Sequence, residues 1–600
     1  MGLPHLALIL SVVPHCVLGA ITVYSAQATH VGLPAYDPAT LIPPPAPTNV
    51  MTSIPVKLQN SGTAGLSIKQ KGSFIGFSIE MSVCNQVLGS NSTLIQVPFL
   101  NLMANIQQRA GSVMVRVGGN TQESAKLVDS LPNGRILSKD LENVTGTTKT
   151  PPLEYTLDLI YLMRNISNFV NVHWFAGIPW FETQPFDLSI VPAANNILGD
   201  YLLGIQAGNE PDMYYLHDHR PATYGPYDYL GEFSDLLSQI VFGADPTGRA
   251  RKLLIGPSTT SFNWSLEQVW NTGFVDKYSA NLAFLAAEKY PNDNCQARFG
   301  NLAQAIPPQN VLHTYLNHTA ILQFLQPYLN TTRYAQAKKK PFLMFETNTA
   351  SCGGFPGVSD SFTAALWGID YSLQLAHSNF SGAMFHVGGQ NVYYNPFTSP
   401  PMNESFFHRW SVGPIYYSAL IMVEALGPSN NSQELDLPIP GISEFTPVYG
   451  IYENGVPKRV AIVNYMDDPN GAHDVDAVIS LANRDGTKTT PSSVRVKYLA
   501  ASSVVQKGNY TWAGQTFGSF FESNGRPMGE KDIKTVACDS ESRTCTVNVP
   551  APGFALVFLS EDAETESSGK VSTTFATTAR TKLRNTATMN LAALATSNGN

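Results

Sequence analysis

The fold is decided by residues 201–211, which read YLLGIQAGNEP: an apolar run ends in glycine, and Asn209-Glu210-Pro211 follows it. Short apolar runs that are bounded by glycine or polar residues are typical of strands buried on both faces. Further runs of this kind occur on both sides of the segment. The eight candidate strands are Ser73–Ile79, Val113–Val117, Val172–Gly177, Tyr201–Ala207, Lys252–Gly256, Val311–Tyr315, Pro341–Phe345 and Gly382–Val387.

Segments with helical periodicity separate the candidate strands: Leu94–Gln108, Tyr155–Phe169, Tyr229–Val241, Ala320–Gln336 and Phe362–His377. Strands that alternate with helices imply parallel strand–helix–strand units, and eight such units close into a (β/α)₈ barrel. We therefore predict an α/β fold in which residues 70–430 form a TIM barrel.

The character of the sequence changes after the barrel. Residues 431–560 contain short alternating runs separated by Gly, Asn, Asp and Pro, a pattern typical of an antiparallel β-sandwich domain. Residues 21–69 read as an extended segment in which Val56–Leu58 is a candidate extra strand of that sandwich. The tail, residues 561–600, is rich in Ser, Thr, Ala and Asn, and we expect it to be disordered.

Residues 1–20 have the features of a secretory signal peptide, because an apolar run, Leu6–Val13, precedes small residues near Ala20. A membrane anchor needs about 18 uninterrupted apolar residues, and Pro4 and Pro14 interrupt this stretch. We therefore expect a secreted, extracellular protein with no membrane partner. Asn-X-Ser/Thr sequons along the chain agree with a glycoprotein.

The composition restricts the class of ligand. Of the 600 residues 14% are charged, the formal net charge is −8, and the isoelectric point is near 5.9. Nucleic acids and dense polyanions select a basic surface. We therefore expect no nucleic-acid partner and a neutral or sparsely charged ligand.

The cysteines predict one disulfide. Removal of the signal peptide would leave five cysteines, an odd number that cannot all pair within one chain. Cys538 and Cys545 flank a polar turn between two strand-like runs, and we predict a bridge across this hairpin. The pairing of Cys84, Cys295 and Cys352 stays open, and at least one thiol is expected to be free or to pair with another chain.

Two glutamates stand where a barrel carries its chemistry, at the C-terminal ends of the strands. Glu210 follows the fourth candidate strand and Glu346 follows the seventh. These strands lie on opposite sides of an eight-stranded ring, so the two carboxylates can face one another across a bound molecule. Retaining glycoside hydrolysis uses such a pair, about 5–5.5 Å apart, as nucleophile and acid/base. Because a lone Glu after a strand is more often a helix N-cap, the interpretation depends on the pair.

Asn209-Glu210-Pro211 resembles the acid/base signature of the glycosidase superfamily that carries catalytic glutamates on strands four and seven of a (β/α)₈ barrel. Other stretches resemble glycoside hydrolase family 79, which comprises β-glucuronidases and heparanase-like enzymes, and are most similar to its fungal secreted β-glucuronidase branch. These stretches are Phe77–Glu80, Val115–Thr121, His313–Asn317, Gly353-Gly354 and Val358–Phe362.

The resemblance implies roles for residues at the strand ends. Glu210 would be the acid/base and Glu346 the nucleophile, and Tyr315 would orient Glu346. Contacts to the sugar hydroxyls would come from Asn209, at the 2-hydroxyl, and from Glu80 and Asn120.

The resemblance also implies how a uronic carboxylate is held. The contacts would be the N–H groups of Gly353 and Gly354 and the side chain of Tyr393 or Tyr394. A glycine pair can direct N–H groups at an anion without a cationic side chain. A tight turn is the plainer interpretation of the same two glycines.

The remaining candidates are weaker. Arg116 is either a charge that steadies the two glutamates or a buried structural arginine. Trp180 and Phe181 could stack on sugar faces, although aromatic residues at strand ends more often belong to the core. Neither an HExxH motif nor a third ligand accompanies His217 and His219. We expect no metal and no cofactor.

These features predict a retaining exo-β-glucuronidase that removes terminal β-linked glucuronic acid from glycans or conjugates. The alternatives are a heparanase-like endo-β-glucuronidase, another β-glycosidase of the same superfamily and, less favoured, a non-catalytic carbohydrate-binding protein. The natural aglycone, the acceptance of 4-O-methyl glucuronate, the oligomeric state and any partner protein stay open.

Overall fold

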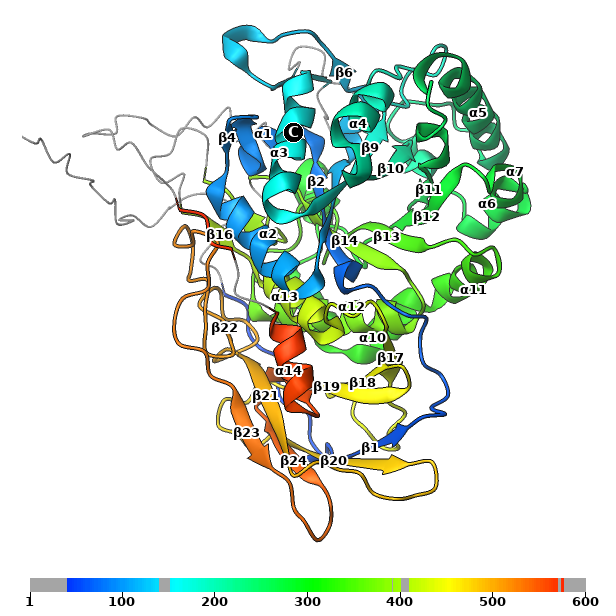
Figure 1. Cartoon of the computed structure of the whole chain (residues 1–600). Coiled ribbons are helices and arrows are strands. Elements are labelled where there is room, and N and C mark those ends of the chain that lie inside the picture. The colour runs from blue at the N-terminus through cyan, green and yellow to red at the C-terminus, as the bar shows by residue number, and fades with distance from the viewer. Residues whose placement is uncertain (1–39, 140–151, 391, 401–408, 570–572, 577–600) are drawn as a thin grey trace, which may run out of the picture.

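The computed structural model describes residues 40–139, 152–390, 392–400, 409–569 and 573–576 (Figure 1). The signal peptide expected at residues 1–20 lies outside these ranges, as do residues 21–39 of the extended segment. Within the described ranges, no helix is both long enough and apolar enough to cross a membrane.

Eight parallel strands close into a barrel, which confirms the predicted α/β fold. Each strand lies beside the next one along the barrel, and the last pairs with the first. In chain order the strands are β2 (Ile75–Glu80), β5 (Val113–Gly118), β9 (Val172–Ile178), β10 (Leu202–Ala207), β11 (Leu254–Thr259), β12 (Leu282–Glu288), β13 (Phe342–Thr347) and β14 (Gly382–Val387).

The sixth barrel strand is not the predicted one. Val311–Tyr315 is helical and divides between α9 (Pro308–Val311) and the 3₁₀ turn η11 (Leu312–Leu316), whereas the sixth strand is β12. The residues of β12 read LAFLAAE, and Ala and Leu have high helix propensity, so local preference conceals this strand. A short apolar run such as Val311–Tyr315 cannot be assigned to strand or helix from periodicity alone.

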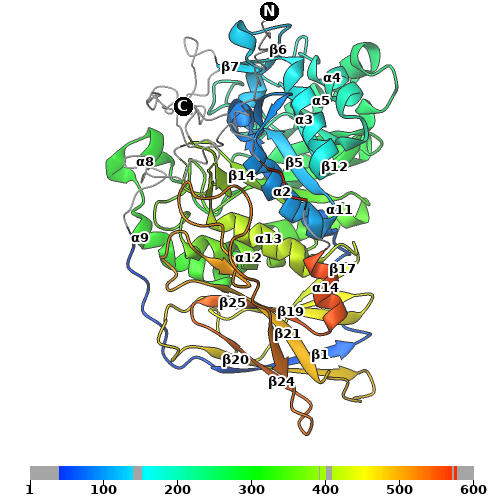
Figure 2. The ribbon, with the colours of Figure 1, turned by 60° about the vertical axis from the view of Figure 1, so that its left-hand side comes forward.

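Helices surround the barrel (Figures 1 and 2). Two of them, α12 (Phe362–His377) and α13 (Pro414–Leu426), lie between the barrel and the C-terminal sheets, and nearly every residue of both is buried. Apolar residues accordingly occur on all sides of both helices, with a few buried polar residues among them. The other helices around the barrel include α2 (Val97–Ala110), α3 (Leu157–Val170), α4 (Ile190–Leu198), α5 (Pro226–Gln239), α6 (Leu266–Asn271), α7 (Phe274–Tyr278), α8 (Cys295–Phe299), α10 (His318–Leu325) and α11 (Leu329–Ala337).

The C-terminal domain consists of two sheets that share one apolar core. One sheet has the order β1-β20-β24, and the other has the order β17-β18-β19-β25-β21-β22, with β23 beside β21. β1 (Ser53–Asn60) contains the candidate strand Val56–Leu58 and pairs in parallel with β20 (Val475–Asn483). The other strands, which pair antiparallel, are β17 (Ser432–Asp436), β18 (Val448–Glu453), β19 (Val456–Asn464), β21 (Ser493–Ala500), β22 (Thr511–Trp512), β23 (Lys534–Ala537), β24 (Cys545–Val549) and β25 (Gly553–Phe558).

The start of the tail, which we expected to be disordered, is a helix, α14 (Glu561–Ser568). Ser560 Oγ accepts a hydrogen bond from the N–H of Ala563 at 3.2 Å and caps the helix. Three acidic residues lie in its first turn, where they interact favourably with the helix dipole. The composition of the tail masks this local start signal. Residues 577–600 lie outside the described ranges.

A buried ionic cluster joins the barrel layer to the C-terminal sheets. Glu424 of α13 is fully buried; it accepts a hydrogen bond from Arg109 Nε at 3.0 Å and pairs with Lys497 of β21. Lys497 Nζ also lies 2.9 Å from Glu564 Oε1 of α14. Burial by itself raises the pKa of Glu424, but Lys497 and Arg109 outweigh burial and lower this pKa to about 2.

Two disulfides are present in the described part of the chain. Cys538 and Cys545 are bridged across the hairpin, as the sequence predicts. The second bridge joins Cys295 to Cys352, and Cys84 is a buried free thiol. The second bridge links the start of α8 to the loop that follows β13, at the C-terminal end of the barrel.

Candidate active site

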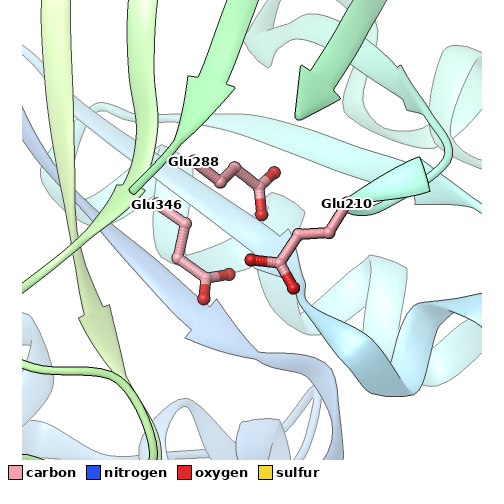
Figure 3. Close-up of side chains that lie close together, drawn as sticks. All are labelled: Glu210, Glu288 and Glu346. Atoms are coloured by element: carbon pink, nitrogen blue, oxygen red, sulfur yellow. The ribbon is translucent and has the colours of Figure 1, made fainter. Parts of the chain in front are cut away.

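Three glutamates meet at the C-terminal end of the barrel (Figure 3). Glu210 follows β10, Glu346 lies in β13 and Glu288 ends β12, and one carboxylate oxygen of each lies within 4.8 Å of the other two. The structure therefore brings the two predicted catalytic residues together, at a spacing that suits the retaining geometry of about 5–5.5 Å. Sequence reasoning missed Glu288 because it belongs to the unrecognised strand.

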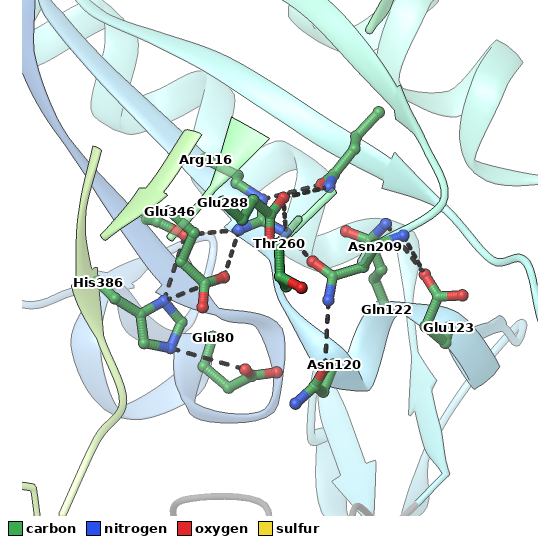
Figure 4. A network of polar contacts seen from close by, with 12 residues as sticks. Glu80, Arg116, Asn120, Gln122, Glu123, Asn209, Thr260, Glu288, Glu346 and His386 are labelled. Carbon is green, nitrogen blue, oxygen red and sulfur yellow. Dashed lines mark hydrogen bonds and ion pairs between the residues drawn. The ribbon is translucent and has the colours of Figure 1, made fainter. Parts of the chain in front are cut away.

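Arg116 of β5 lies among these carboxylates (Figure 4). Its side chain is fully buried, donates to Glu346 Oε2 at 2.5 Å and lies 3.5 Å from Glu288 Oε1. Three acidic groups at this spacing could hold a cation, and here a guanidinium supplies the positive charge. Arg116 also donates to Gln206 Oε1 at 2.9 Å and to Asn209 Oδ1, so it fixes several groups of the site at once.

The backbone holds Glu210 in a strained conformation. Its φ is +49°, in the left-handed region that residues with a side chain rarely adopt. Although Glu210 stands at the N-cap of η7 (Pro211–Met213), its side chain makes no capping hydrogen bond. Burial raises the pKa of Glu210 well above its usual value, and the nearby charges of Glu346 and Asp212 add to the effect. We therefore expect Glu210 to keep its proton, as an acid catalyst must.

Glu346 has the opposite electrostatic environment. Tyr290 donates its hydroxyl to Glu346 Oε1 at 2.8 Å, and His386 Nδ1 lies 3.5 Å from Oε2, where Arg116 also binds. Burial alone would raise the pKa of Glu346, but His386, Arg116 and the Tyr290 hydrogen bond outweigh it and lower the pKa. The two shifts therefore favour an ionised Glu346 and a protonated Glu210, which are the states that a nucleophile and an acid require.

The tyrosine that contacts Glu346 is Tyr290 and not Tyr315. Tyr315 donates its hydroxyl to the carbonyl oxygen of Thr349 at 2.6 Å and accepts a hydrogen bond from Asn292 Nδ2 at 3.0 Å. The predicted role of Tyr315 is wrong because its segment is not the sixth strand. Tyr290 comes two residues after β12, so a correct assignment of that strand would have identified it.

The residues predicted to hold sugar hydroxyls gather beside the glutamates (Figure 4). Asn209 Nδ2 donates to Asn120 Oδ1 at 3.1 Å. Glu80 Oε1 accepts a hydrogen bond from the N–H of Thr121 at 3.0 Å, and Glu80 Oε2 lies 3.8 Å from His386 Nε2. These contacts hold the polar side chains in place beside the glutamates. A sugar could therefore bind these side chains without rearrangement.

A further buried carboxyl group, which sequence reasoning missed, supports the backbone before Glu210. Glu123 Oε1 accepts a hydrogen bond from the N–H of Asn209 at 2.7 Å, and Oε2 accepts one from the Tyr214 hydroxyl at 2.7 Å. Burial raises the pKa of Glu123 to about 8. A carboxyl group six residues beyond the second predicted strand was a visible signal, because strand-end loops carry the site.

Both residues of the glycine pair have a positive φ, which favours glycine at these positions. Gly353 and Gly354 have φ of +95° and +79°, and a Cβ at Gly354 would lie 2.6 Å from Ser359 Oγ. Their carbonyl oxygens accept hydrogen bonds from Tyr393 N at 2.7 Å and Asn294 Nδ2 at 2.9 Å. Among the described residues, none accepts a hydrogen bond from the N–H group of either glycine. Neither N–H group is therefore paired with another group in the described part of the chain.

Of the two tyrosine candidates, Tyr394 lies within the site. Its ring centroid is 6.0 Å from that of His386 and 6.1 Å from that of Tyr290. Tyr393 binds the glycine loop through its backbone. Burial lowers the pKa of Arg298 in α8. The electrostatic effect of Tyr393 and Tyr394, which lie nearby, opposes this lowering. The site therefore has a neighbouring cation that sequence reasoning missed, because Arg298 lies in the loop of the unrecognised strand.

The weaker candidates separate into core and surface. Trp180 is fully buried, whereas the side chain of Phe181 is 39% exposed. His217 and His219 have rings 5.9 Å apart, but in the described part of the chain they belong to no group of three potential metal ligands. Phe181 is thus the aromatic residue of this set that a ligand can reach.

We expect Tyr290→Phe to reduce kcat/KM about 10- to 100-fold, because it removes a hydrogen bond to a carboxylate. The loss of this bond raises the pKa of Glu346, so the acidic limb of the pH–rate profile should move to higher pH. The matched control is Tyr315→Phe, which removes a hydroxyl that does not contact Glu346. A larger loss in Tyr315→Phe than in Tyr290→Phe would contradict the assignment.

Comparison with known proteins shows which proteins this chain resembles. The family described as "Glycosyl hydrolase family 79 C-terminal beta domain" matches residues 448–556. A β-glucuronidase of Aspergillus niger is 26% identical over 521 residues, which are 81% of this chain and 90% of that protein. A β-glucuronidase of Neurospora crassa is 26% identical over 347 residues, which are 53% of this chain and 58% of that protein.

Solved structures agree on the fold. The crystal structure of a 4-O-α-L-rhamnosyl-β-D-glucuronidase from Fusarium oxysporum covers 85% of this chain and all of its own, with a TM-score of 0.63 and 19% identity. A family 51 α-L-arabinofuranosidase from Bifidobacterium longum has a TM-score of 0.55 and 11% identity over the same shares of the two chains. The C-terminal domain match and the two relatives make this chain similar to glycoside hydrolase family 79.

Proposed function

We propose that this chain is a retaining β-glucuronidase. The observation that carries the proposal is the opposed pair Glu210 and Glu346, with a raised pKa for the first and a lowered pKa for the second. Glu346 attacks the anomeric carbon while Glu210 gives its proton to the leaving oxygen, so the C–O bond breaks and a glycosyl ester forms. Glu210 then takes a proton from water, whose oxygen displaces Glu346 and releases the sugar.

The substrate class follows from the loop after β13. A uronic carboxylate would accept hydrogen bonds from the N–H groups of Gly353 and Gly354 and from the Tyr394 hydroxyl, with Arg298 nearby. The two relatives are named β-glucuronidases, which supports a terminal glucuronate as the group recognised. A carbohydrate with terminal glucuronic acid is therefore the proposed substrate.

We further propose that the enzyme acts from chain ends and is secreted. The net charge of −8 disfavours a cleft for a polysulfated chain, which would need clustered Lys and Arg. Two disulfides support an oxidising, extracellular compartment, because such bridges are rare in reducing ones. The heparanase-like endo-acting enzyme is the alternative.

The pH dependence follows from the signs of the two shifts. Activity requires ionised Glu346 and protonated Glu210, so it should decline below the lowered pKa of Glu346 and above the raised pKa of Glu210. The active range should therefore include acidic pH.

We expect hydrolysis of an aryl β-glucuronide, with little or no hydrolysis of the matched β-glucoside, β-galactoside and β-xyloside. The reason is that the neutral sugars lack the carboxylate that the N–H groups of Gly353 and Gly354 would bind. The same enzyme incubated with heparan sulfate should release at most monomeric glucuronate. A rapid fall in the average size of that polymer would support the endo alternative, and the absence of any glycoside turnover would support a carbohydrate-binding protein.

A further inference from the structure

The general acid, Glu210, identifies the side of the site on which the leaving group departs. Glu210 must reach the glycosidic oxygen, so the leaving group lies on its side of the cleft. Strand β10, which precedes Glu210, pairs with β9 on one side and β11 on the other. The loops that follow β9 and β11 therefore flank Glu210 at the same end of the barrel. Each of these loops presents one exposed phenylalanine, Phe181 at 39% and Phe262 at 61% exposure.

Phe262 is held in place by the segment that carries the acid. Its N–H donates to Asp212 Oδ2 at 2.8 Å, and Asp212 is a buried residue two positions beyond Glu210. Thr260 donates to the same carboxylate through its N–H at 2.9 Å and its hydroxyl at 2.7 Å. Between them, Ser261 has a φ of +58°, in the left-handed region. A strained loop with three hydrogen bonds to one buried carboxylate thus keeps a large apolar side chain in solvent.

Phe181 is fixed from the other side of the same segment. Its N–H donates to the carbonyl oxygen of Glu123 at 3.0 Å, and its own carbonyl accepts a hydrogen bond from Arg220 Nη1 at 3.0 Å. Its ring meets that of His219 edge to face, with centroids 4.8 Å apart. Both exposed rings are therefore anchored to residues 209–220, which begin with the acid and its neighbour.

The basic groups around the two rings carry little free positive charge. Arg220 Nε is paired with Glu232 Oε1 at 2.7 Å. Burial lowers the pKa of His217, and it lowers the pKa of His219 to about 3, so the imidazole of His219 is neutral near neutral and mildly acidic pH. A surface of this kind suits the apolar face of a ring and offers no partner for a sulfate.

We propose that Phe262 and Phe181 form the leaving-group subsite, which takes an uncharged ring that stacks by its flat apolar face. The ligand is either a neutral sugar or an aryl group, and the inference rests on the proposed glucuronidase function. The ring leaves with the oxygen that Glu210 protonates, so contacts with it help to orient the bond that breaks. Selectivity for the glucuronate and selectivity for the aglycone thus reside on different loops.

The test compares substrates with and without a ring in the leaving group. The readout is kcat/KM for an aryl β-glucuronide and for a glucuronosyl disaccharide, each divided by kcat/KM for β-glucuronosyl fluoride, whose leaving group has no ring. We expect Phe262→Ala to lower at least one of these ratios about tenfold, mainly through KM, because stacking is lost. The Phe262→Trp variant keeps an aromatic ring, so its ratio should equal that of the unaltered enzyme. The ratio that falls further identifies aryl or sugar as the preferred ring.

The matched control is Phe242→Ala, which removes an 88% exposed ring from η8 (Ile240–Ala244), at the end of α5 and outside the strand-end loops. This control should leave both ratios unchanged. Unchanged ratios in Phe262→Ala would overturn the subsite while the fluoride is still cleaved. Failure of the unaltered enzyme to release fluoride would overturn the glucuronidase function and the subsite together.

Discussion

The Glu346→Ala enzyme should hydrolyse β-glucuronides at least about 10⁴-fold more slowly than the unaltered enzyme, because no covalent intermediate can form. Glu210→Ala should behave differently: it should lose about 10²- to 10⁴-fold on substrates whose leaving group needs a proton, and retain slow turnover of activated aryl substrates. The measurement is kcat/KM over a series of leaving groups with graded acidity. Full activity in either variant would contradict the assignment.

Azide separates the two roles by stereochemistry. In Glu210→Ala, azide can displace Glu346 from the glycosyl ester and should give the β-glucuronosyl azide. In Glu346→Ala, azide can instead take the place of the nucleophile and should give the α-anomer. NMR identifies the anomer that forms in each variant. The anomer shows on which face of the sugar ring the removed carboxylate acts. The opposite pattern would show that the two roles are exchanged.

The Lys497→Met variant should lose about 3–5 kcal/mol of unfolding free energy, because it leaves the buried Glu424 without one of its two cations. The pKa of Glu424 is lowered in the folded protein, to about 2. Its pairing therefore stabilises the fold above its usual pKa, and this contribution is lost as pH falls from about 4.5 towards 2. Denaturant midpoints between pH 3 and 7 should show a weaker pH dependence in the variant.

The control for this experiment is Lys534→Met. Lys534 Nζ lies 2.9 Å from Asp532 Oδ2, and both side chains are more than half exposed. An exposed pair of this kind contributes no more than about 1 kcal/mol. Equal losses in the two variants would show that the buried cluster does not stabilise the junction of barrel and sandwich.

The sequence predicted the site where a residue directly follows a recognisable strand, and failed where the strand was not recognisable. Glu210 and Glu346 could be found because β10 and β13 read as apolar runs. β12 contains three alanines, and its parallel pairing with β11 and β13 overrides a local preference for helix. Because this strand was not recognised, neither Glu288 nor Tyr290 was identified, and the role of orienting Glu346 was assigned to Tyr315.

Other functional residues were concealed in a different way. His386 lies inside β14, so it reads as part of a buried strand, and only the closure of the barrel turns it towards Glu80 and Glu346. Phe262 lies three residues beyond β11, and its exposure and its link to Asp212 depend on backbone geometry. Chemistry that depends on which face a side chain occupies needs the closed ring, which no local pattern describes.

Strand β1 has a consequence for the order in which this chain can be assembled during synthesis. Its last residue, Asn60, bonds to Asn483, 423 positions later, and the whole barrel is encoded between them. The side chains of Ile54, Val56 and Leu58, which are buried in the folded protein, therefore have no partner strand until the ribosome has made the barrel and then β20. A fragment that starts at residue 431 would expose the edge of β20, which invites aggregation. The sandwich is consequently not a module that can be excised at the domain boundary.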